Sequence, residues 1–225
     1  MIRYLILLFL DMEILDSSVA AEVADKLLEI EAIRLQPEKP FTWASGWKSP
    51  IYCDNRLSLS FPPVRNLIKE QLVRNVQHYF PQAEAIAGVA TAGIPQGALL
   101  ANDLDLPFVY VRSKAKGHGM ENMIEGKVIP GQKVVIVEDL VSTGGSSLKA
   151  AQDLKNAGFE VLGMVSIFSY GFDLAAKNFE NAGIKLVCLC HYEALLPRAL
   201  SKNYISEEML KSLSAWRKDP ANWTP

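Results

Sequence analysis

The chain has 225 residues, of which 49% are hydrophobic, with a formal net charge of −2 and a pI near 6.0. This length and composition can bury one sizeable core, and the weak negative charge gives no basic field of the kind that nucleic-acid binding requires. The three cysteines fit no disulfide framework, and no credible export signal is present, so we expect a cytoplasmic protein without a nucleic-acid partner.

An apolar run at residues 1–10 opens the chain, and acidic residues follow it closely. The run looks like the start of a signal peptide, but these acids stand where small residues should prepare a cleavage site. It is also far shorter than the roughly 20 residues that span a bilayer. We therefore expect no membrane association. Residues 1–15 are predicted to be an N-terminal extension ahead of a more natural start at Met12, and residues 1–10 to be dispensable for catalysis.

Helix and strand signals alternate along the rest of the chain. Ser17 or Ser18 can cap a helix that runs through Leu35, and residues 42–56 read as loop and strand. Further helices are predicted from Pro62 or Pro63 to near Tyr79 and at 94–102, 148–158, 174–181 and 207–217. Strands are predicted at 85–90, 108–112, 133–138, 161–168 and 186–190.

This alternation predicts one α/β domain over residues 16–225, built on a central parallel sheet flanked by helices. We expect an N-terminal helix and a small cap in residues 16–60, the core sheet in 84–192, and a C-terminal helical segment in 193–225. Ligands should gather at the carboxyl ends of the strands. Cys188 and Cys190 are expected to pack in the core rather than bind a metal, and His78 and His191 to be packing or surface residues.

The most informative segment is residues 134–147. An apolar strand ends in two adjacent acids, Glu138 and Asp139, and a turn rich in hydroxyls and glycine leads into a helix. Such a turn at a helix N-terminus binds anions through free N–H groups and the helix dipole. The acids would repel a phosphate unless they face sugar hydroxyls and a cation, so the combination predicts a sugar phosphate with Mg²⁺. No Gly-Lys-Ser/Thr sequence is present, which excludes a Walker loop.

Two other segments converge on the same edge of the sheet. Thr91, Ala92 and Gly93 form a small-residue turn after a strand, where backbone amides can approach an anion closely. Residues 112–126 alternate cations and a histidine with glycine and lack hydrophobic periodicity, which predicts a mobile loop. Taken alone, the first could be an ordinary turn and the second a solvated charged surface.

Residues 134–147 resemble the phosphoribosyl-pyrophosphate (PRPP) signature of the type I phosphoribosyltransferases. In that family the acids hold the ribose hydroxyls, the glycine-rich turn wraps the 5′-phosphate, and the position of residues 91–93 is the pyrophosphate loop. The resemblance implies PRPP contacts at Thr91, Ala92, Gly93, Arg112, Lys116, His118, Glu138, Asp139, Leu140, Val141, Ser142, Thr143, Gly144, Gly145 and Ser146.

The same resemblance assigns roles to the loop at 112–126. Arg112, Lys116 and His118 would grip the pyrophosphate, and Lys116 or His118 would donate a proton or hydrogen bond to it as it leaves. With Asp139, these two are the expected catalytic residues. In the family the loop closes over the neighbouring subunit's site, which implies a homodimer. Mg²⁺ is the expected cofactor, held mainly by PRPP and water rather than by protein ligands.

The segment Phe41-Thr-Trp-Ala-Ser-Gly-Trp-Lys-Ser-Pro50 is similar to the N-terminal segment of the orotate phosphoribosyltransferases, in which it precedes an aromatic strand over the base. This likeness covers nearly the whole chain from about Asp16. It implies a hood over the base and the transfer of ribose 5-phosphate from PRPP to orotate, in pyrimidine nucleotide synthesis. The candidate orotate-binding residues are Lys48, Tyr52, Arg56 and Ser142.

The chain departs from the family pattern at three places. Some members carry a lysine at the position of Ala44, a Tyr-Lys pair at Thr91-Ala92, and an orotate-contacting arginine at Tyr170. The groups that hold the orotate carboxylate are therefore left open. Two alternatives also remain: a purine-base phosphoribosyltransferase, which should lack the 41–50 pattern, and a PRPP-sensing regulator that binds nucleic acid, which would need an added DNA-binding module.

Overall fold

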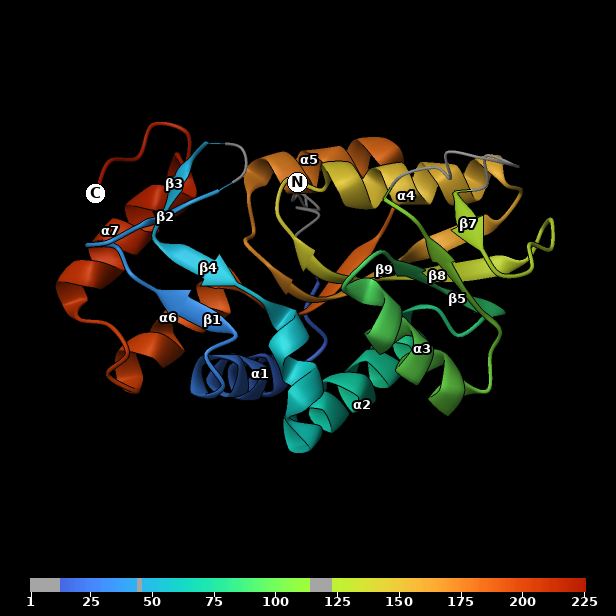
Figure 1. The fold of residues 1–225 in the computed structure, drawn as a ribbon, viewed down its shortest axis with the longest axis horizontal. Helices are drawn as coiled ribbons and strands as arrows, with labels where there is room; N and C mark the ends of the chain where they lie inside the picture. The colour runs from blue at the N-terminus through green and yellow to red at the C-terminus, as the bar shows by residue number, and fades with distance from the viewer. Residues whose placement is uncertain (1–12, 44–45, 114–122) are drawn as a thin grey trace, which may run out of the picture.

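A six-stranded, mostly parallel sheet forms the centre of the computed structural model, which describes residues 13–43, 46–113 and 123–225 (Figure 1). The strand order is β10-β9-β8-β5-β6-β7, and only the β6–β7 pair is antiparallel. This confirms the predicted α/β fold. The strands are β5 (Ala85–Val89), β6 (Phe108–Val111), β7 (Ile124–Glu125), β8 (Lys133–Val141), β9 (Glu160–Ser169) and β10 (Leu186–His191).

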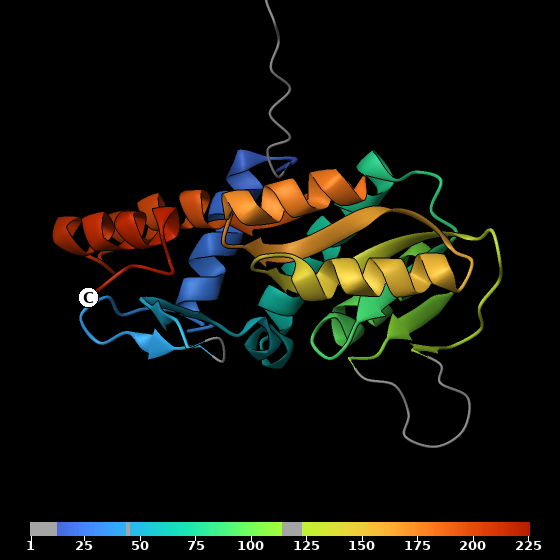
Figure 2. The same ribbon diagram turned by 90° about the horizontal axis from the view of Figure 1, so that it is seen from above.

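Helices cover both faces of this sheet (Figures 1 and 2). On β8, Val135 and Val137 pack into one core and Val134 and Ile136 into the other, as the alternation of side chains along a strand requires. The first core is covered by α1, α2 and α3, and the second by α4 and α5. These helices are α1 (Ser17–Glu29), α2 (Pro62–Tyr79), α3 (Gly93–Leu104), α4 (Gly145–Asn156) and α5 (Asp173–Ala182).

The remaining elements form one end of the molecule, beside α1 (Figure 1). Two small antiparallel sheets lie here, β1 with β4 and β2 with β3, together with a 3₁₀ helix and two C-terminal helices. Helix α6 lies in the predicted C-terminal helical segment, although its bounds were not predicted. The elements are β1 (Ile33–Leu35), β2 (Phe41–Thr42), β3 (Lys48–Ser49), β4 (Ile51–Cys53), η1 (Asn55–Ser60), α6 (Tyr192–Ser201) and α7 (Glu207–Lys218).

The first helix differs from its prediction at both ends. Asp16 caps it in place of Ser17 or Ser18, because its Oδ1 accepts a hydrogen bond of 2.8 Å from the backbone N–H of Ser18. The helix ends at Glu29, well before Leu35. The apolar spacing that suggested a longer helix is also satisfied by strand β1, where Ile33 pairs with Cys53 of β4.

Three further corrections concern the elements around the expected site. Strand β8 continues to Val141, past its predicted end at Glu138, so the acid pair lies within the strand rather than at its end. Helix α4 begins at Gly145 instead of Leu148. Part of the predicted loop at 112–126 is ordered, because Ile124–Glu125 forms β7 and pairs with β6.

The N-terminal segment joins the sheet at its first described residue. Glu13 forms a parallel bridge with Val187 of β10, and its carbonyl accepts a hydrogen bond of 3.0 Å from the backbone N–H of Cys188. Its carboxylate lies 3.0 Å from Lys185 Nζ. Over the described ranges, the structure contains no helix with the length and apolar character needed to cross a membrane.

Candidate active site

The two predicted anion-binding turns meet at the carboxyl edge of the sheet. Strands β5 and β8 are parallel neighbours, with Gly88 paired to Val137. Helix α3 starts at Gly93, where a Cβ atom would run into the carbonyl oxygen of Val137 and lie 3.5 Å from the Cα of Glu138. Only glycine permits this approach, so the turn at residues 91–93 is packed directly against the strand that carries the acids.

The turn between β8 and α4 also depends on glycine. Gly144 has φ +82°, and a Cβ atom there would lie 2.7 Å from Cε2 of Phe179. Asn178 of α5 fixes the same turn, because its Nδ2 donates a hydrogen bond of 2.9 Å to the carbonyl of Thr143. Gly145 and Ser146 are exposed at the start of α4, where the backbone N–H groups have no intrahelical partners. This is the arrangement in which the start of a helix can bind an anion, and the predicted role of the turn stays a prediction.

Glu138 is folded back toward the first turn of α4. Ser147 Oγ donates a hydrogen bond of 2.9 Å to Glu138 Oε2, and the backbone N–H of Asp139 donates one of 3.1 Å to Oε1. Burial, and then the neighbouring Asp139 carboxylate, raise the pKa of Glu138 to about 8. Burial also raises the pKa of Asp139. The pair thus resists carrying two negative charges at neutral pH in the free protein.

The hood is the part of the chain that forms the two small sheets, β1 with β4 and β2 with β3. A buried asparagine directly after the hood links it to the acid pair. Asn55, at the start of η1, donates a hydrogen bond of 2.6 Å from Nδ2 to the carbonyl of Asp139. Ser58 Oγ donates to the carbonyl of Asn55 at 2.6 Å and accepts from Nε2 of Gln96 of α3 at 3.3 Å. These three residues are buried. They join the hood, the acid pair and the start of α3 into one network.

Sequence reasoning did not single out Asn55 or Ser147. Ser147 stands directly after the predicted turn, in the first turn of α4, and this position was the signal that could have found it. For Asn55 no local signal exists, because its contact with Asp139 joins residues 84 positions apart.

Tyr52 and Lys48, two of the predicted orotate-binding residues, have partners within the hood. The Tyr52 ring lies 5.4 Å from that of Phe41, and the Arg34 guanidinium lies 5.1 Å from its centroid. Lys48 Nζ donates a hydrogen bond of 2.8 Å to Thr42 Oγ1. Tyr52 is half-buried and Lys48 is exposed.

Arg56, a predicted orotate-binding residue, acts on Asp139 of the acid pair through its positive charge. It makes a bidentate ion pair with Asp54, at 2.6 and 2.8 Å, and its positive charge is among the effects that lower the pKa of Asp139 against the larger effect of burial. Ser142, the fourth candidate, is half-buried in the β8–α4 turn. The structure thus places Ser142 in the turn that follows the acid pair, whereas the guanidinium of Arg56 is bonded to Asp54.

The remaining residues that the family resemblance assigns to PRPP differ in how exposed their side chains are. Thr91 is exposed and Ala92 and Leu140 are partly buried, whereas the Val141 side chain is fully buried, so only its backbone can face a ligand. Arg112 follows β6 and pairs with Glu125 of β7 at 3.1 Å. Ala44, Lys116 and His118 lie outside the described residues.

Tyr170, at the position of the family's orotate-contacting arginine, is buried among aromatic side chains. Its ring lies 5.1 Å from that of Trp43 and 5.8 Å from that of Trp216, and burial raises the pKa of its hydroxyl. This residue is therefore part of the packing behind the site. Cys188 and Cys190 are buried in the core, as expected.

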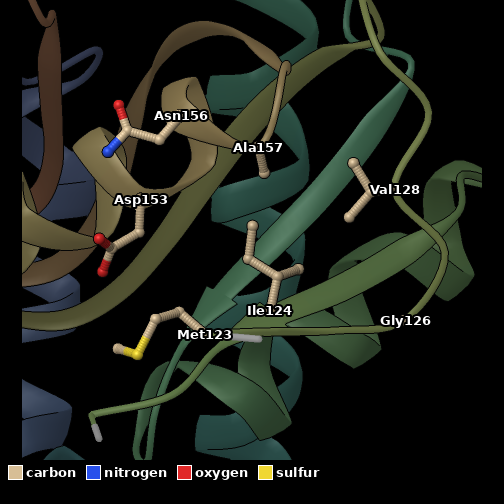
Figure 3. A pocket seen from close by; sticks show the side chains of 7 residues that line it. All are labelled: Met123, Ile124, Gly126, Val128, Asp153, Asn156 and Ala157. Atoms are coloured by element: carbon tan, nitrogen blue, oxygen red, sulfur yellow. The ribbon is translucent and has the colours of Figure 1, made fainter. Parts of the chain in front are cut away.

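One cavity lies beside the predicted turn, and a larger one lies away from it. A hollow of about 300 Å³ is lined by residues that include Trp47 of the hood, Thr143 of the turn and Arg217 of α7. A larger hollow of about 480 Å³ lies at the opposite end of α4 (Figure 3). Its acid, Asp153, pairs with Lys149 at 2.6 Å. We therefore place the active site at the acid pair and the two turns. The larger hollow is lined by Met123, Ile124, Gly126, Val128, Asp153, Asn156 and Ala157.

Comparison with known proteins identifies the family to which the chain is similar. Residues 62–189 match the family described as the phosphoribosyl transferase domain. The orotate phosphoribosyltransferase of Cytophaga hutchinsonii is 59% identical over 202 residues, which cover 90% of this chain and 97% of that protein. That of Listeria innocua is 53% identical over 206 residues, 92% of this chain and 99% of that protein.

Solved structures show the same fold. The UMP synthase of Leishmania donovani superposes with a TM-score of 0.77 at 30% identity, over 89% of this chain and 42% of that chain. The orotate phosphoribosyltransferase of Aeropyrum pernix superposes with a TM-score of 0.72 at 28% identity, over 82% of this chain and 99% of that chain.

Proposed function

We infer from the site and from these relatives that the chain belongs to the orotate phosphoribosyltransferases and transfers ribose 5-phosphate from PRPP to orotate, with orotidine 5′-monophosphate and pyrophosphate as products. This reaction is a step of pyrimidine nucleotide synthesis. The structural observation that supports this assignment most directly is the packing of Gly93 against Val137. It brings the turn at residues 91–93 next to the strand that carries the acid pair and leads into the second turn.

Each part of the site suits one part of PRPP. The turn at residues 142–146 would hold the 5′-phosphate through the backbone N–H groups at the start of α4. Glu138 and Asp139 would accept hydrogen bonds from the two ribose hydroxyls. The turn at residues 91–93 would hold the pyrophosphate, with Arg112, Lys116 and His118 closing over it.

The chemical step requires mainly that the two substrates be positioned and that the charges that develop on them be stabilised. As the C1–O bond breaks, positive charge develops on the ribose and negative charge on the departing pyrophosphate, while a ring nitrogen of orotate forms the new bond to C1. The carboxylate of Asp139 would lie beside the ribose, where positive charge grows. The cations of the 112–126 loop would face the growing negative charge, and Lys116 or His118 would donate a hydrogen bond or proton to the leaving oxygen.

The acid pair also fits the expected magnesium ion. Mg²⁺ prefers oxygen ligands and usually binds through one or two carboxylates together with substrate phosphates and water. Glu138 and Asp139 supply carboxylate oxygens next to both phosphate turns. The ion would neutralise the charge of the pyrophosphate. Glu138 and Asp139 would contact it through the ribose hydroxyls or water, and PRPP would supply most of its ligands.

For the base, we propose that the hood covers orotate and that Arg56 attracts its carboxylate. Arg56 is exposed and its charge already reaches Asp139. Ser142 and the backbone of the turn would bind the ring, and Tyr52 would pack near it. Lys48 would add positive charge from the hairpin.

Substrate preference tests the assignment. Purified protein should form product from PRPP and orotate in the presence of Mg²⁺, and should form little from adenine, hypoxanthine or uracil. Activity with adenine or hypoxanthine instead of orotate would identify a purine-base enzyme. Binding of PRPP without turnover of any base would favour a PRPP-sensing regulator.

We also propose a homodimer in which the loop at 112–126 acts on the neighbouring subunit. Lys116→Ala should lower turnover by at least about 100-fold, the size expected of a group that stabilises the transition state. Mixing this variant with Asp139→Asn subunits should restore part of the activity, because one hybrid site would then contain both native residues. Verified heterodimers with no restored activity would show that the loop acts within its own subunit.

A further inference from the structure

The last helix of the chain is bonded to the β2–β3 hairpin, which the proposed function places over the base. Trp216 of α7 is 0% exposed, and its indole Nε1–H donates a hydrogen bond of 3.1 Å to the carbonyl of Lys48 in β3. Lys48 in turn pairs with Thr42 of β2. A single buried donor thus connects the C-terminal helix to the backbone of the β2–β3 hairpin, residues 41–49.

The ring of Trp216 adds contacts on both sides of the site. It meets Trp43, next to β2, edge-on at 5.6 Å. It also lies 5.8 Å from Tyr170 and 5.4 Å from Phe172, in the segment that joins β9 to α5. This ring therefore lies between the hairpin and the segment behind the β8–α4 turn.

The neighbouring Arg217 fixes α7 to that same segment. Its Nη2 donates a hydrogen bond of 2.7 Å to the carbonyl of Gly171, and its Nη1 lies 3.1 Å from Oε1 of Glu193 in α6. Arg217 also lines the hollow of about 300 Å³ together with Trp47 and Thr143. Helix α7 therefore borders the space between the hairpin and the β8–α4 turn.

The hairpin needs such an anchor because it is small. Its strands β2 and β3 have two residues each, and an isolated two-stranded hairpin is marginally stable at best in water. Its position must come from tertiary contacts. A buried indole N–H is costly to leave without an acceptor, so the bond to Lys48 favours one position of the hairpin over others.

We propose that Trp216 is a positioning residue for the base: it holds the β2–β3 hairpin at the separation from the β8–α4 turn that orotate requires. The inference rests on the proposed function, which assigns the hairpin to the base. It predicts that Trp216 affects the use of orotate and leaves the binding of PRPP unchanged, because PRPP is held by the two turns and the acid pair.

The test compares Trp216→Phe with Tyr192→Phe. The first variant retains an aromatic ring and removes the N–H that bonds Lys48. The second removes the hydroxyl that donates to the carbonyl of Leu213 at 3.2 Å, a buried bond to the same helix that does not involve the hairpin. Trp216→Phe should raise KM for orotate by about five-fold or more, the factor given by the typical net contribution of one hydrogen bond. KM for PRPP should stay within about two-fold.

Tyr192→Phe should leave both KM values unchanged, although it removes a buried bond of similar length. Equal changes in KM for orotate and for PRPP in Trp216→Phe, or an unchanged KM for orotate, would overturn the inference while the wild-type activity still supported the proposed function. A wild-type protein that does not use orotate would overturn both.

A measurement on the unaltered chain covers the case in which Trp216→Phe does not fold. In a ¹⁵N-labelled sample the Trp216 indole signal, assigned by exclusion with Phe variants of the other three tryptophans, should exchange slowly with solvent and should shift when orotate joins a saturating amount of PRPP. Fast exchange, or a shift produced by PRPP alone, would contradict the role.

Discussion

The side-chain amide of Asn55 donates a hydrogen bond of 2.6 Å to the main-chain carbonyl of Asp139. Asn55 begins the 3₁₀ helix that follows the hood, and Asp139 is one of the two acids assigned to the ribose. Because Asn55 is 1% exposed, this bond is shielded from water. The 3₁₀ helix that follows the hood and the strand that carries the acid pair are therefore held together, although they come from distant parts of the chain.

Asn55→Ala should weaken the use of PRPP by about ten-fold in kcat/KM. The change leaves the Asp139 carbonyl without its buried donor, which costs about 1–3 kcal/mol, and lets the acid strand shift. Steady-state kinetics with PRPP varied at saturating orotate measures this effect. Ser58→Ala is the comparison variant, since it removes the bond to the Asn55 carbonyl and the one accepted from Gln96 but keeps the bond from Asn55 to Asp139. Equal losses in the two variants would mean that only the stability of η1 matters.

Glu138→Gln should reduce the pH dependence of stability. Burial first, then Asp139, raise the pKa of Glu138 from 4.5 to about 8 in the folded protein. The folded state therefore binds this proton more tightly than the unfolded state. Below pH 4.5 Glu138 is protonated in both states, and burying it costs no charge. As the pH rises from 4.5 through 8, the cost of burying the charge grows and the protein loses stability.

Calorimetric unfolding at a series of pH values, without PRPP or Mg²⁺, measures this difference. From about pH 5.5 to about pH 9, the Tm of the wild-type protein should fall further than that of Glu138→Gln, by at least about 2 °C. Parallel curves for the two proteins would show that Glu138 ionises at its ordinary pKa in the folded state.

Gly93→Ala should be strongly destabilising and should abolish activity. Its new methyl group would collide with the Val137 carbonyl, and relieving the collision requires the 91–93 turn to move away from the acid strand. Gly145→Ala is the control for stability, because the nearest atom to its Cβ would be Thr143 Oγ1 at 4.0 Å. Thermal unfolding should show a loss of several degrees for Gly93→Ala and little change for Gly145→Ala. A Gly93→Ala protein with wild-type stability and activity would refute the close packing of the two turns.

A chain that starts at Met12 should keep full activity, whereas one that starts at Leu15 should lose stability. The shorter chain lacks Glu13, whose backbone bridges Val187 and whose carboxylate pairs with Lys185. Thermal unfolding and turnover of both truncated proteins separate the two effects. Loss of activity in the Met12 protein would mean that residues 1–11 have a role in catalysis.

Features that depend on local spacing were predictable from the sequence. The apolar runs in β5, β8 and β9 predicted the strands, and the small-residue turns after β5 and β8 predicted where helices α3 and α4 begin, to within three residues, because both are set by residues next to one another. The acids Glu138 and Asp139 misled the prediction of the end of β8. Carboxylates are disfavoured in strands, but pairing with β9, as between Leu140 and Phe168, extends the strand past them.

Features that depend on tertiary packing were not predictable. The predicted C-terminal helical segment includes α6, but the bounds of this helix were not predictable, because it contains Pro197 and proline usually breaks a helix. Two contacts of the site, from Asn55 to Asp139 and from Trp216 to Lys48, join residues 84 and 168 positions apart. Spacing along the chain carries no signal at such separations, so the support behind the acids and behind the hairpin emerged only from the fold.

Calorimetric titration of PRPP into the purified protein with Mg²⁺, and into Asp139→Asn under the same conditions, tests the central claim most directly. The account predicts saturable binding with one PRPP for each chain in the wild-type protein, and binding at least about ten-fold weaker in the variant, as expected when a charged hydrogen-bonding group is lost. A folded wild-type protein that gives no heat of binding with PRPP would contradict the assignment of residues 138–146 as the PRPP site.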